Sequence, residues 1–277
     1  MQKYGLIGRT LKHSLSPEIH NSAFQKLNLN ARYHTIEIDP DDFDRMIVQL
    51  KKEDYSGFNI TIPYKSRIMA FLDRVDSDAQ IVAAVNTIYV HQGEWHGFNT
   101  DIQGFLAPLS NLHLHIKNCI VLGSGGAARA VIFALIKYIK PEKIIISCRN
   151  TANGEKLQKQ FLPYLKNISC LVDHLAGIGK EIGTADLIIN TTPVGMSPDI
   201  SDSPLKFGYR AQKGAVFYDL IYNPTQTKFL AEAKGAGEGI LTINGMSMLL
   251  SQAAKSFELW TGRKFPYDEI KSMMYDT

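Results

Sequence analysis

The sequence predicts an α/β protein with two domains, and three observations carry that prediction. Strand-like runs alternate with helix-like runs along nearly the whole chain, which is the pattern of α/β architecture. A glycine-rich turn in the middle of the chain lies between an apolar run and a helix-like run, as at the start of a separate α/β unit. The 277 residues are 45% hydrophobic, which is enough for one large core or two modest ones.

In the first part of the chain, short apolar runs predict strands and amphipathic runs predict helices. The expected strands are residues 4–7, 33–38, 57–62 and 87–90, and the expected helices are residues 17–27, 40–52 and 78–85. Ser16 is the expected N-cap of the first helix, with Pro17 in its first turn.

The second part of the chain repeats this alternation, and we place its start near Gln103. The expected strands are residues 118–122, 143–148, 187–190 and 216–220, and the expected helices are residues 127–139, 151–161 and 246–260. The boundary is inferred from the glycine-rich turn that follows it, because the composition does not change there.

Composition excludes several classes of protein. The net charge of +3 is too small to indicate binding to nucleic acid or a membrane. Three widely spaced cysteines predict neither a disulfide framework nor a zinc site and fit a reducing cytoplasm. We see no signal peptide at the start of the sequence and no apolar run near the roughly 20 residues that span a bilayer.

Residues 123–128 read Gly-Ser-Gly-Gly-Ala-Ala and fit the dinucleotide-binding pattern G-x-G-x-x-A. Gly123 allows a tight turn, Gly125 lets a pyrophosphate approach the backbone, and the small Ala128 allows close packing of helix on strand. The free N–H groups of the helix N-terminus would then face the phosphates. A glycine-rich turn that binds no ligand remains the alternative.

The end of the next strand indicates which dinucleotide is bound. An NAD site usually places an acidic residue there, whereas this sequence has Arg149 between Cys148 and Asn150. A guanidinium offers a planar fork of donors that suits the 2′-phosphate of NADP. The alternative is a solvated charge at a strand end.

Short polar residues gather where the strands of the first part end. The four segments are His13 to Pro17, Asn59 to Lys65, Asn86 with Thr87, and Asn99 to Asp101. Open α/β sheets bind ligands at the carboxyl ends of their strands, so these hydroxyl, amide, amine and carboxylate groups suit a small polyol. Each segment alone also fits ordinary turn or cap chemistry.

With these segments in order, the sequence resembles the shikimate dehydrogenase family over nearly its whole length. The matching segments are residues 4–8, 13–17, 59–65, 84–87, 99–101, the glycine turn, residues 190–196, 218–224 and 244–245, with Met248, Leu249 and Gln252. The run Asn-Ile-Thr-Ile-Pro-Tyr-Lys at residues 59–65 is the most specific of them.

The resemblance implies an N-terminal α/β substrate domain, residues 1–102 completed by 246–277, and a Rossmann-like NADP domain, residues 103–245, with the active site in the cleft between them. It implies that Lys65 and Asp101 form the catalytic pair of an NADPH-dependent ketone reduction that needs no metal. The expected substrate ligands are Ser14 and Ser16 for a carboxylate, and Asn59, Thr61, Asn86, Asp101, Tyr222 and Gln252 for the ring hydroxyls. The expected cofactor ligands are Gly123, Ser124, Gly125, Gly126 and Ala127 for the pyrophosphate, Arg149 for the 2′-phosphate, and Asn190, Thr191, Leu220 and Gly245 for the rest.

The sequence departs from the family pattern at two positions. Asn153 stands where the family often has a second arginine, and Ser247 stands where a second glycine is usual. The missing second arginine bears on affinity for the 2′-phosphate. The nearest alternative to a shikimate dehydrogenase is a quinate/shikimate dehydrogenase with relaxed cofactor use. A non-catalytic relative that binds such ligands is the other, and a folate-linked dehydrogenase is disfavoured by the serine segment. We expect a monomer or a homodimer.

Overall fold

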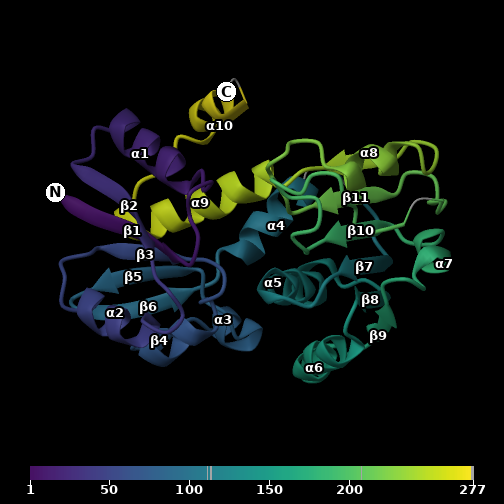
Figure 1. Ribbon diagram of the computed structural model, residues 1–277, viewed down its shortest axis with the longest axis horizontal. Coiled ribbons are helices and arrows are strands. Elements are labelled where there is room, and N and C mark those ends of the chain that lie inside the picture. The colour runs from purple at the N-terminus through teal and green to yellow at the C-terminus, as the bar shows by residue number, and fades with distance from the viewer. Residues whose placement is uncertain (111, 113, 207, 276–277) are drawn as a thin grey trace. The chain divides into compact units, whose positions relative to one another are not determined.

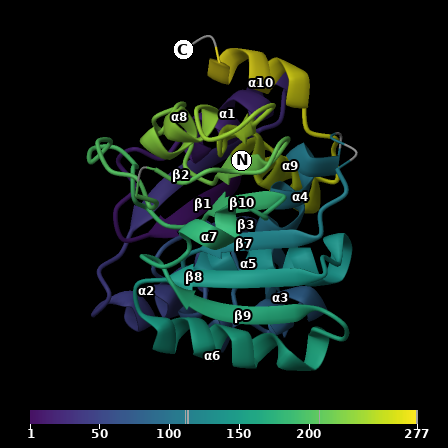
Figure 2. The ribbon, with the colours of Figure 1, turned by 90° about the vertical axis from the view of Figure 1, so that its right-hand side faces the viewer.

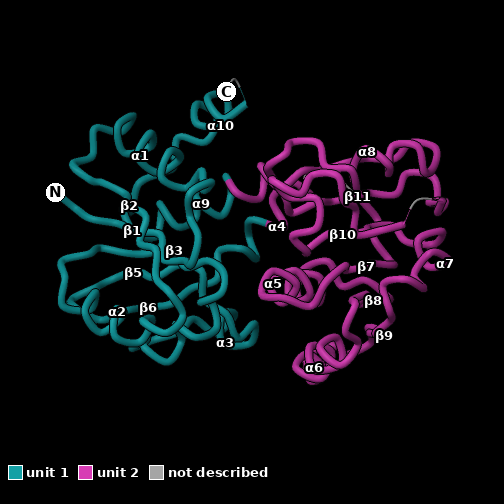
Figure 3. The backbone as a smooth tube through the Cα atoms, viewed as in Figure 1, with its two compact units in different colours: residues 1–104, 250–277 teal, residues 105–249 magenta. Residues whose placement is uncertain are grey.

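The computed structural model describes residues 1–110, 112, 114–206 and 208–275. Its chain forms two compact units (Figure 1; Figure 3). Unit 1 contains Met1–Gly104 and Leu250–Thr277, and unit 2 contains Phe105–Leu249. Each unit has helices packed on its own sheet, which confirms the expected α/β class.

The sheet of unit 1 has six strands in the order β2-β1-β3-β5-β6-β4. Their bounds are β1 Gln2–Gly8, β2 Ala31–Glu37, β3 Gly57–Ile60, β4 Arg74–Val75, β5 Thr87–His91 and β6 Glu94–Phe98. Strands β2 and β3 flank β1 in parallel, whereas β5 runs antiparallel to both β3 and β6. The parallel strands β1 and β3 therefore end at the same edge of the sheet.

Helices lie on both faces of the sheet of unit 1. The bounds are α1 Ser16–Lys26, α2 Phe43–Leu50, a 3-10 turn Arg67–Phe71, α3 Ser77–Val82, α9 Met246–Thr261 and α10 Tyr267–Tyr275. One core joins Phe43 and Ile47 of α2 to Phe58 of β3. On the opposite face Trp260 of α9 stacks on Tyr4 with ring centroids 4.9 Å apart. Period-two alternation along β3 sends Asn59 to this second face.

Helix α1 begins differently from its prediction. Ser16 is the first helical residue, and Leu15 occupies the cap position without a side-chain hydrogen bond. The Ser16 N–H instead donates to Oγ of Ser14 at 3.3 Å. The prediction that Ser16 caps the helix is wrong, because the helix starts one residue earlier and Ser14 supplies the acceptor.

The sheet of unit 2 is fully parallel, with six strands in the order β12-β11-β10-β7-β8-β9. The bounds are β7 Asn118–Leu122, β8 Lys143–Cys148, β9 Ser169–His174, β10 Leu187–Asn190, β11 Val216–Asp219 and β12 Leu241–Ile243. Figure 2 shows β10, β7, β8 and β9 following one another across this sheet. The chain order reverses between β7 and β10, which is where sheets of this kind bind dinucleotides.

The helices of unit 2 cover both of its sheet faces. They are α5 Gly126–Ala134, extended by a π turn Leu135–Ile139, α6 Thr151–Phe161, a 3-10 turn Leu162–Tyr164, α7 Gly179–Ile182 and α8 Lys228–Lys234. Helix α4, Asp101–Ser110, begins in unit 1 and ends in unit 2. None of the helices in the described part of the chain is both long and apolar enough to cross a membrane.

Candidate active site

An ion pair between Lys65 and Asp101 lies in unit 1. Nζ of Lys65 is 2.6 Å from Oδ2 of Asp101, and the two side chains are 18% and 8% exposed. Lys65 follows β3, and its backbone carbonyl accepts a hydrogen bond from the Val85 N–H at 2.7 Å. Asp101 is the first residue of α4, where the helix dipole favours a negative charge. A short charge-assisted bond at low exposure holds the amine in one place.

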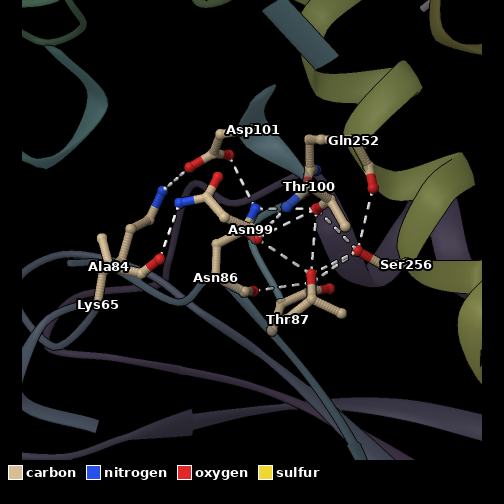
Figure 4. A network of polar contacts seen from close by, with 10 residues as sticks. Lys65, Ala84, Asn86, Thr87, Asn99, Thr100, Asp101, Gln252 and Ser256 are labelled. Atoms are coloured by element: carbon tan, nitrogen blue, oxygen red, sulfur yellow. Dashed lines mark hydrogen bonds and ion pairs between the residues drawn. The ribbon is translucent and has the colours of Figure 1, made fainter. Parts of the chain in front are cut away.

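Asn86 fixes the other oxygen of the Asp101 carboxylate. Its Nδ2 donates to Oδ1 of Asp101 at 2.8 Å (Figure 4). Its own Oδ1 accepts the backbone N–H of Thr100 at 2.7 Å, so the amide can point only one way. Lys65 and Asn86 thus hold the two carboxylate oxygens of Asp101, one each.

A buried polar layer lies next to this carboxylate. Asn59 accepts a hydrogen bond from the Tyr33 hydroxyl at 2.8 Å and donates from Nδ2 to Thr87 and Ser256, each at 3.1 Å. Asn59 is 5% exposed. Its amide therefore has protein partners on both ends, which suits support of the site more than direct contact with a ligand.

No role was predicted for Thr87, Thr100 or Ser256. Thr87 and Thr100 belong to the polar segments at the strand ends. Ser256 follows Gln252 by four residues on α9, which places both on one face of the helix. That spacing was the available signal for Ser256.

Asn99 is a further buried residue of this cluster. Its Nδ2 donates to the Ala84 carbonyl at 2.9 Å. Its Oδ1 is buried and has no hydrogen-bond partner among the residues that the structure describes. Figure 4 shows Asn99 beside Lys65 and Asp101, with its hydrogen bond going to Ala84.

The two serines expected to bind a carboxylate lie at the start of α1. Ser16 is buried at 8% exposure, and the Ser14 hydroxyl lies in front of the first N–H of the helix. Burial raises the pKa of Tyr33 well above its ordinary value, and a hydrogen bond with the Ser16 side chain acts in the opposite direction. The Tyr33 hydroxyl itself donates to Oδ1 of Asn59 at 2.8 Å.

The remaining expected substrate ligands belong to three different elements. Thr61 follows β3 and is half-buried, with its N–H donating to the Ile7 carbonyl at 2.9 Å. Gln252 lies on α9 in unit 1. Tyr222 follows β11, is half-buried, and belongs to unit 2.

The glycine turn of unit 2 has room for a pyrophosphate. Gly123 has φ +113° and a Cβ there would lie 2.6 Å from Oγ1 of Thr191, so only glycine fits. A Cβ on Gly125 or Gly126 would meet no heavy atom of the described residues within 4 Å. Ser124 and Ala127 beside them are half-buried. An open approach to the backbone at the N-terminus of α5 is what an anionic cofactor needs.

Arg149 directly follows β8 and is exposed. Helix α6 begins two residues later, at Thr151. Asn153 lies in its first turn and is also exposed. Arg149 thus places one cation directly after β8, the second strand of unit 2 along the chain. A 2′-phosphate would bind at this strand end.

The ends of β10 and β11 are joined through Asp219. Its Oδ1 accepts from Asn190 Nδ2 and from the Ile221 N–H, each at 3.0 Å, and its Oδ2 accepts from Thr227 at 2.6 Å. Burial raises the pKa of Asp219 to about 6, against the lowering effect of these donors. Thr191 donates to the Leu122 carbonyl at 2.7 Å. Asn190 and Thr191 are therefore held rigidly at the switch point.

Gly245 lies directly against the chain after β11. A Cβ there would be 2.1 Å from the carbonyl oxygen of Leu220, and the Gly245 N–H donates to the Ile221 carbonyl at 2.9 Å. The structure thus brings Leu220 and Gly245 together.

Two family models match this chain. Residues 6–88 match the shikimate dehydrogenase substrate binding domain. Residues 245–272 match the shikimate 5′-dehydrogenase C-terminal domain.

Relatives and solved structures match along nearly all of the chain. The shikimate dehydrogenase (NADP(+)) of Caldanaerobacter subterraneus subsp. tengcongensis is 39% identical over 98% of this chain and 97% of its own. A crystal structure of shikimate dehydrogenase in complex with NADP+ has a TM-score of 0.89 at 36% identity, covering 100% of this chain and 95% of that one. The Thermus thermophilus enzyme in complex with NADP(H) and shikimate has a TM-score of 0.87 at 31% identity, covering 100% and 99%.

Proposed function

Because the chain belongs to the shikimate dehydrogenase family, we propose that it catalyses the reversible NADPH-dependent reduction of 3-dehydroshikimate to shikimate. This oxidoreductase reaction at a CH–OH group is a step toward chorismate and the aromatic amino acids. The observation that carries the proposal is the buried Lys65–Asp101 pair at 2.6 Å. A lysine held this way by a carboxylate can act on a ketone oxygen.

Reduction of a ketone adds a hydride to carbon and a proton to oxygen. NADPH, when bound, supplies the hydride. Lys65 donates a hydrogen bond to the ketone oxygen and transfers its proton there as negative charge develops. Asp101 keeps the Lys65 amine in place, and the same two groups take the proton back in the reverse direction.

The substrate would be held by hydroxyl and amide groups of the expected set. Ser14 and Ser16 would donate to the substrate carboxylate. Thr61, Asn86, Tyr222 and Gln252 would position the ring hydroxyls, together with Asp101. Asn59 would act one layer below them, because its amide already has protein partners.

The cofactor residues of unit 2 fit NADP. Residues 123–127 would hold the pyrophosphate, supported by the open approach at Gly125 and Gly126. Arg149 would bind the 2′-phosphate. The remaining contacts would come from Asn190, Thr191, Leu220 and Gly245.

A quinate/shikimate dehydrogenase with relaxed cofactor use is the second candidate. The observation that favours it is the loop after β8, where Arg149 is the only basic side chain from residue 148 to residue 153. The buried ion pair argues against a non-catalytic relative.

Steady-state oxidation of shikimate and of quinate, each with NADP and with NAD, tests the proposal. We expect the highest kcat/KM with shikimate and NADP. Higher kcat/KM with quinate would support the second candidate, and no turnover with either substrate would contradict both. The same purification from cells that carry the empty vector controls for contaminating activity.

We further propose a cytoplasmic monomer or homodimer that acts on a small molecule. Cys119, Cys148 and Cys170 are all free and buried, which suits a reducing compartment. Sedimentation equilibrium would establish the oligomeric state.

A further inference from the structure

Three buried hydroxyl groups meet next to Asn86. Oγ1 of Thr87 is 2.8 Å from Oγ of Ser256 and 3.1 Å from Oγ1 of Thr100, and Thr100 and Ser256 are 3.2 Å apart. Thr87 and Ser256 are 0% exposed, and Thr100 is 1% exposed. We call this group the hydroxyl triangle (Figure 4).

The hydroxyl triangle lies between two side-chain amides. Nδ2 of Asn59 donates to Thr87 and Ser256, and Nδ2 of Asn86 donates to Oγ1 of Thr100 at 3.0 Å. The second hydrogen of Asn86 Nδ2 goes to Asp101. The Asn86 amide that holds Oδ1 of Asp101 is therefore held on its other side by both the backbone N–H and the hydroxyl of Thr100.

Ser256 is the member of the triangle that comes from the distant end of the chain. It lies in the middle of α9, and its hydroxyl donates to the backbone carbonyl of Gln252 at 3.0 Å. Serine is a poorer helix former than alanine in a helix interior, and this type of bond tends to bend a helix. A hydroxyl at this position therefore has a local cost, which its three further polar partners offset.

We propose that Ser256 is a positioning residue for catalysis, acting through Thr100 and Asn86 on Asp101. The inference rests on the proposed function of the Lys65–Asp101 pair. Without the Ser256 hydroxyl, Thr87, Thr100 and Asn59 all lose a partner inside a buried site. The Thr100 hydroxyl that supports the Asn86 amide is then less well fixed, and Asp101 holds the Lys65 amine less firmly.

The Ser256→Ala variant tests this inference. Its kcat should fall about five- to tenfold, the equivalent of roughly one net hydrogen bond, while KM for shikimate and Kd for NADP change less than about twofold. The matched control is Ser251→Ala on the same helix, whose hydroxyl lies 3.3 Å from the Tyr267 hydroxyl and outside the triangle. A wild-type kcat in Ser256→Ala would overturn the inference.

A double-mutant cycle separates positioning from a loss of general structure. In an Asp101→Asn background, adding Ser256→Ala should leave the residual kcat unchanged, because the group through which Ser256 acts is already altered. An equal fall in both backgrounds would show a merely structural role and overturn the inference.

A readout that does not depend on turnover keeps the inference separate from the proposed function. The Asn86 side-chain amide signals in an NMR spectrum, assigned with Asn86→Ala, should exchange hydrogen slowly in the wild type and in Ser251→Ala. They should exchange faster in a folded Ser256→Ala variant. Unchanged exchange would refute the inference, whereas an inactive wild type with the expected exchange pattern would refute only the proposed function.

Discussion

Oδ2 of Asp101 accepts the Lys65 amine at 2.6 Å, and this is the contact on which the proposed chemistry depends. Because both side chains are mostly buried, water does not replace either partner easily. The pair lies within unit 1, and its geometry is set by segments from β3 to the start of α4.

Lys65→Ala should lower kcat by about 10²- to 10⁴-fold, the usual range for a lost acid–base group. KM should change less, because other residues bind the substrate. Lys117→Ala, which removes an exposed lysine paired with Glu142 at 3.0 Å, is the control and should keep wild-type kinetics. A nearly unchanged kcat in Lys65→Ala would mean that another group protonates the ketone oxygen.

Replacing both Ser14 and Ser16 with alanine should weaken shikimate binding and leave NADPH binding unchanged. Each hydrogen bond lost to a charged carboxylate should cost about 1.5–3 kcal/mol. Part of the effect of Ser14→Ala will come from the Ser16 N–H, which loses its acceptor. Calorimetry measures both affinities. Normal shikimate binding by the double variant would contradict the proposal that these serines bind the substrate carboxylate.

Arg149→Ala should weaken NADP binding by about ten- to a hundredfold, the equivalent of one charged contact of roughly 1.5–3 kcal/mol. NAD binding should stay nearly constant, because NAD has no phosphate at that position. Arg149→Asp should favour NAD through repulsion of the phosphate. Dissociation constants for both cofactors check this, with Lys156→Ala, an exposed lysine of α6, as the charge-matched control. A wild type that prefers NAD would contradict the prediction.

Asp219→Asn should change how stability depends on pH. Burial raises the pKa of Asp219 from 3.8 to about 6, so the folded protein favours the protonated carboxyl group. The contribution of the Asp219 carboxyl group to the free energy of unfolding is fully present below pH 3.8, and it is lost as pH rises through 6. Asparagine imitates the protonated form at every pH.

Urea unfolding of wild type and Asp219→Asn across this pH range measures the effect. The free energy of unfolding of the wild type, relative to the variant, should fall by roughly 3 kcal/mol as pH rises through the range. A difference that stays constant with pH would show that folding does not raise the pKa of Asp219.

The central strands of the parallel sheets were predictable, because they are apolar runs between clear turn signals. Strands β7, β8 and β10 and helix α6 have their predicted bounds. The exposed edge strands β4, β9 and β12 and the hairpin strand β6 were not predicted. Their sequences are short or mixed in polarity, so no period stands out.

The candidate site shows a similar division. Lys65, Asn86 and Asp101 stood out because each is polar at the end of an apolar segment. Ser256 did not, since a serine on an amphipathic helix looks like any other. Its partners lie up to 197 positions away in the chain, and only the fold reveals them.

The return of α9 to the first sheet has a consequence for the protein during synthesis. Gly57 leaves space for the Trp260 indole, which donates to the Ile88 carbonyl at 2.9 Å. Unit 2 is one continuous segment, so it can fold as soon as it leaves the ribosome. The sheet of unit 1 is completed only when Leu250–Thr277 has been synthesised, and until then α9 does not cover its apolar face. We therefore expect a chain stopped after residue 249 to fold its second half while its first half stays sensitive to protease, a pattern that limited proteolysis of the truncated protein would reveal.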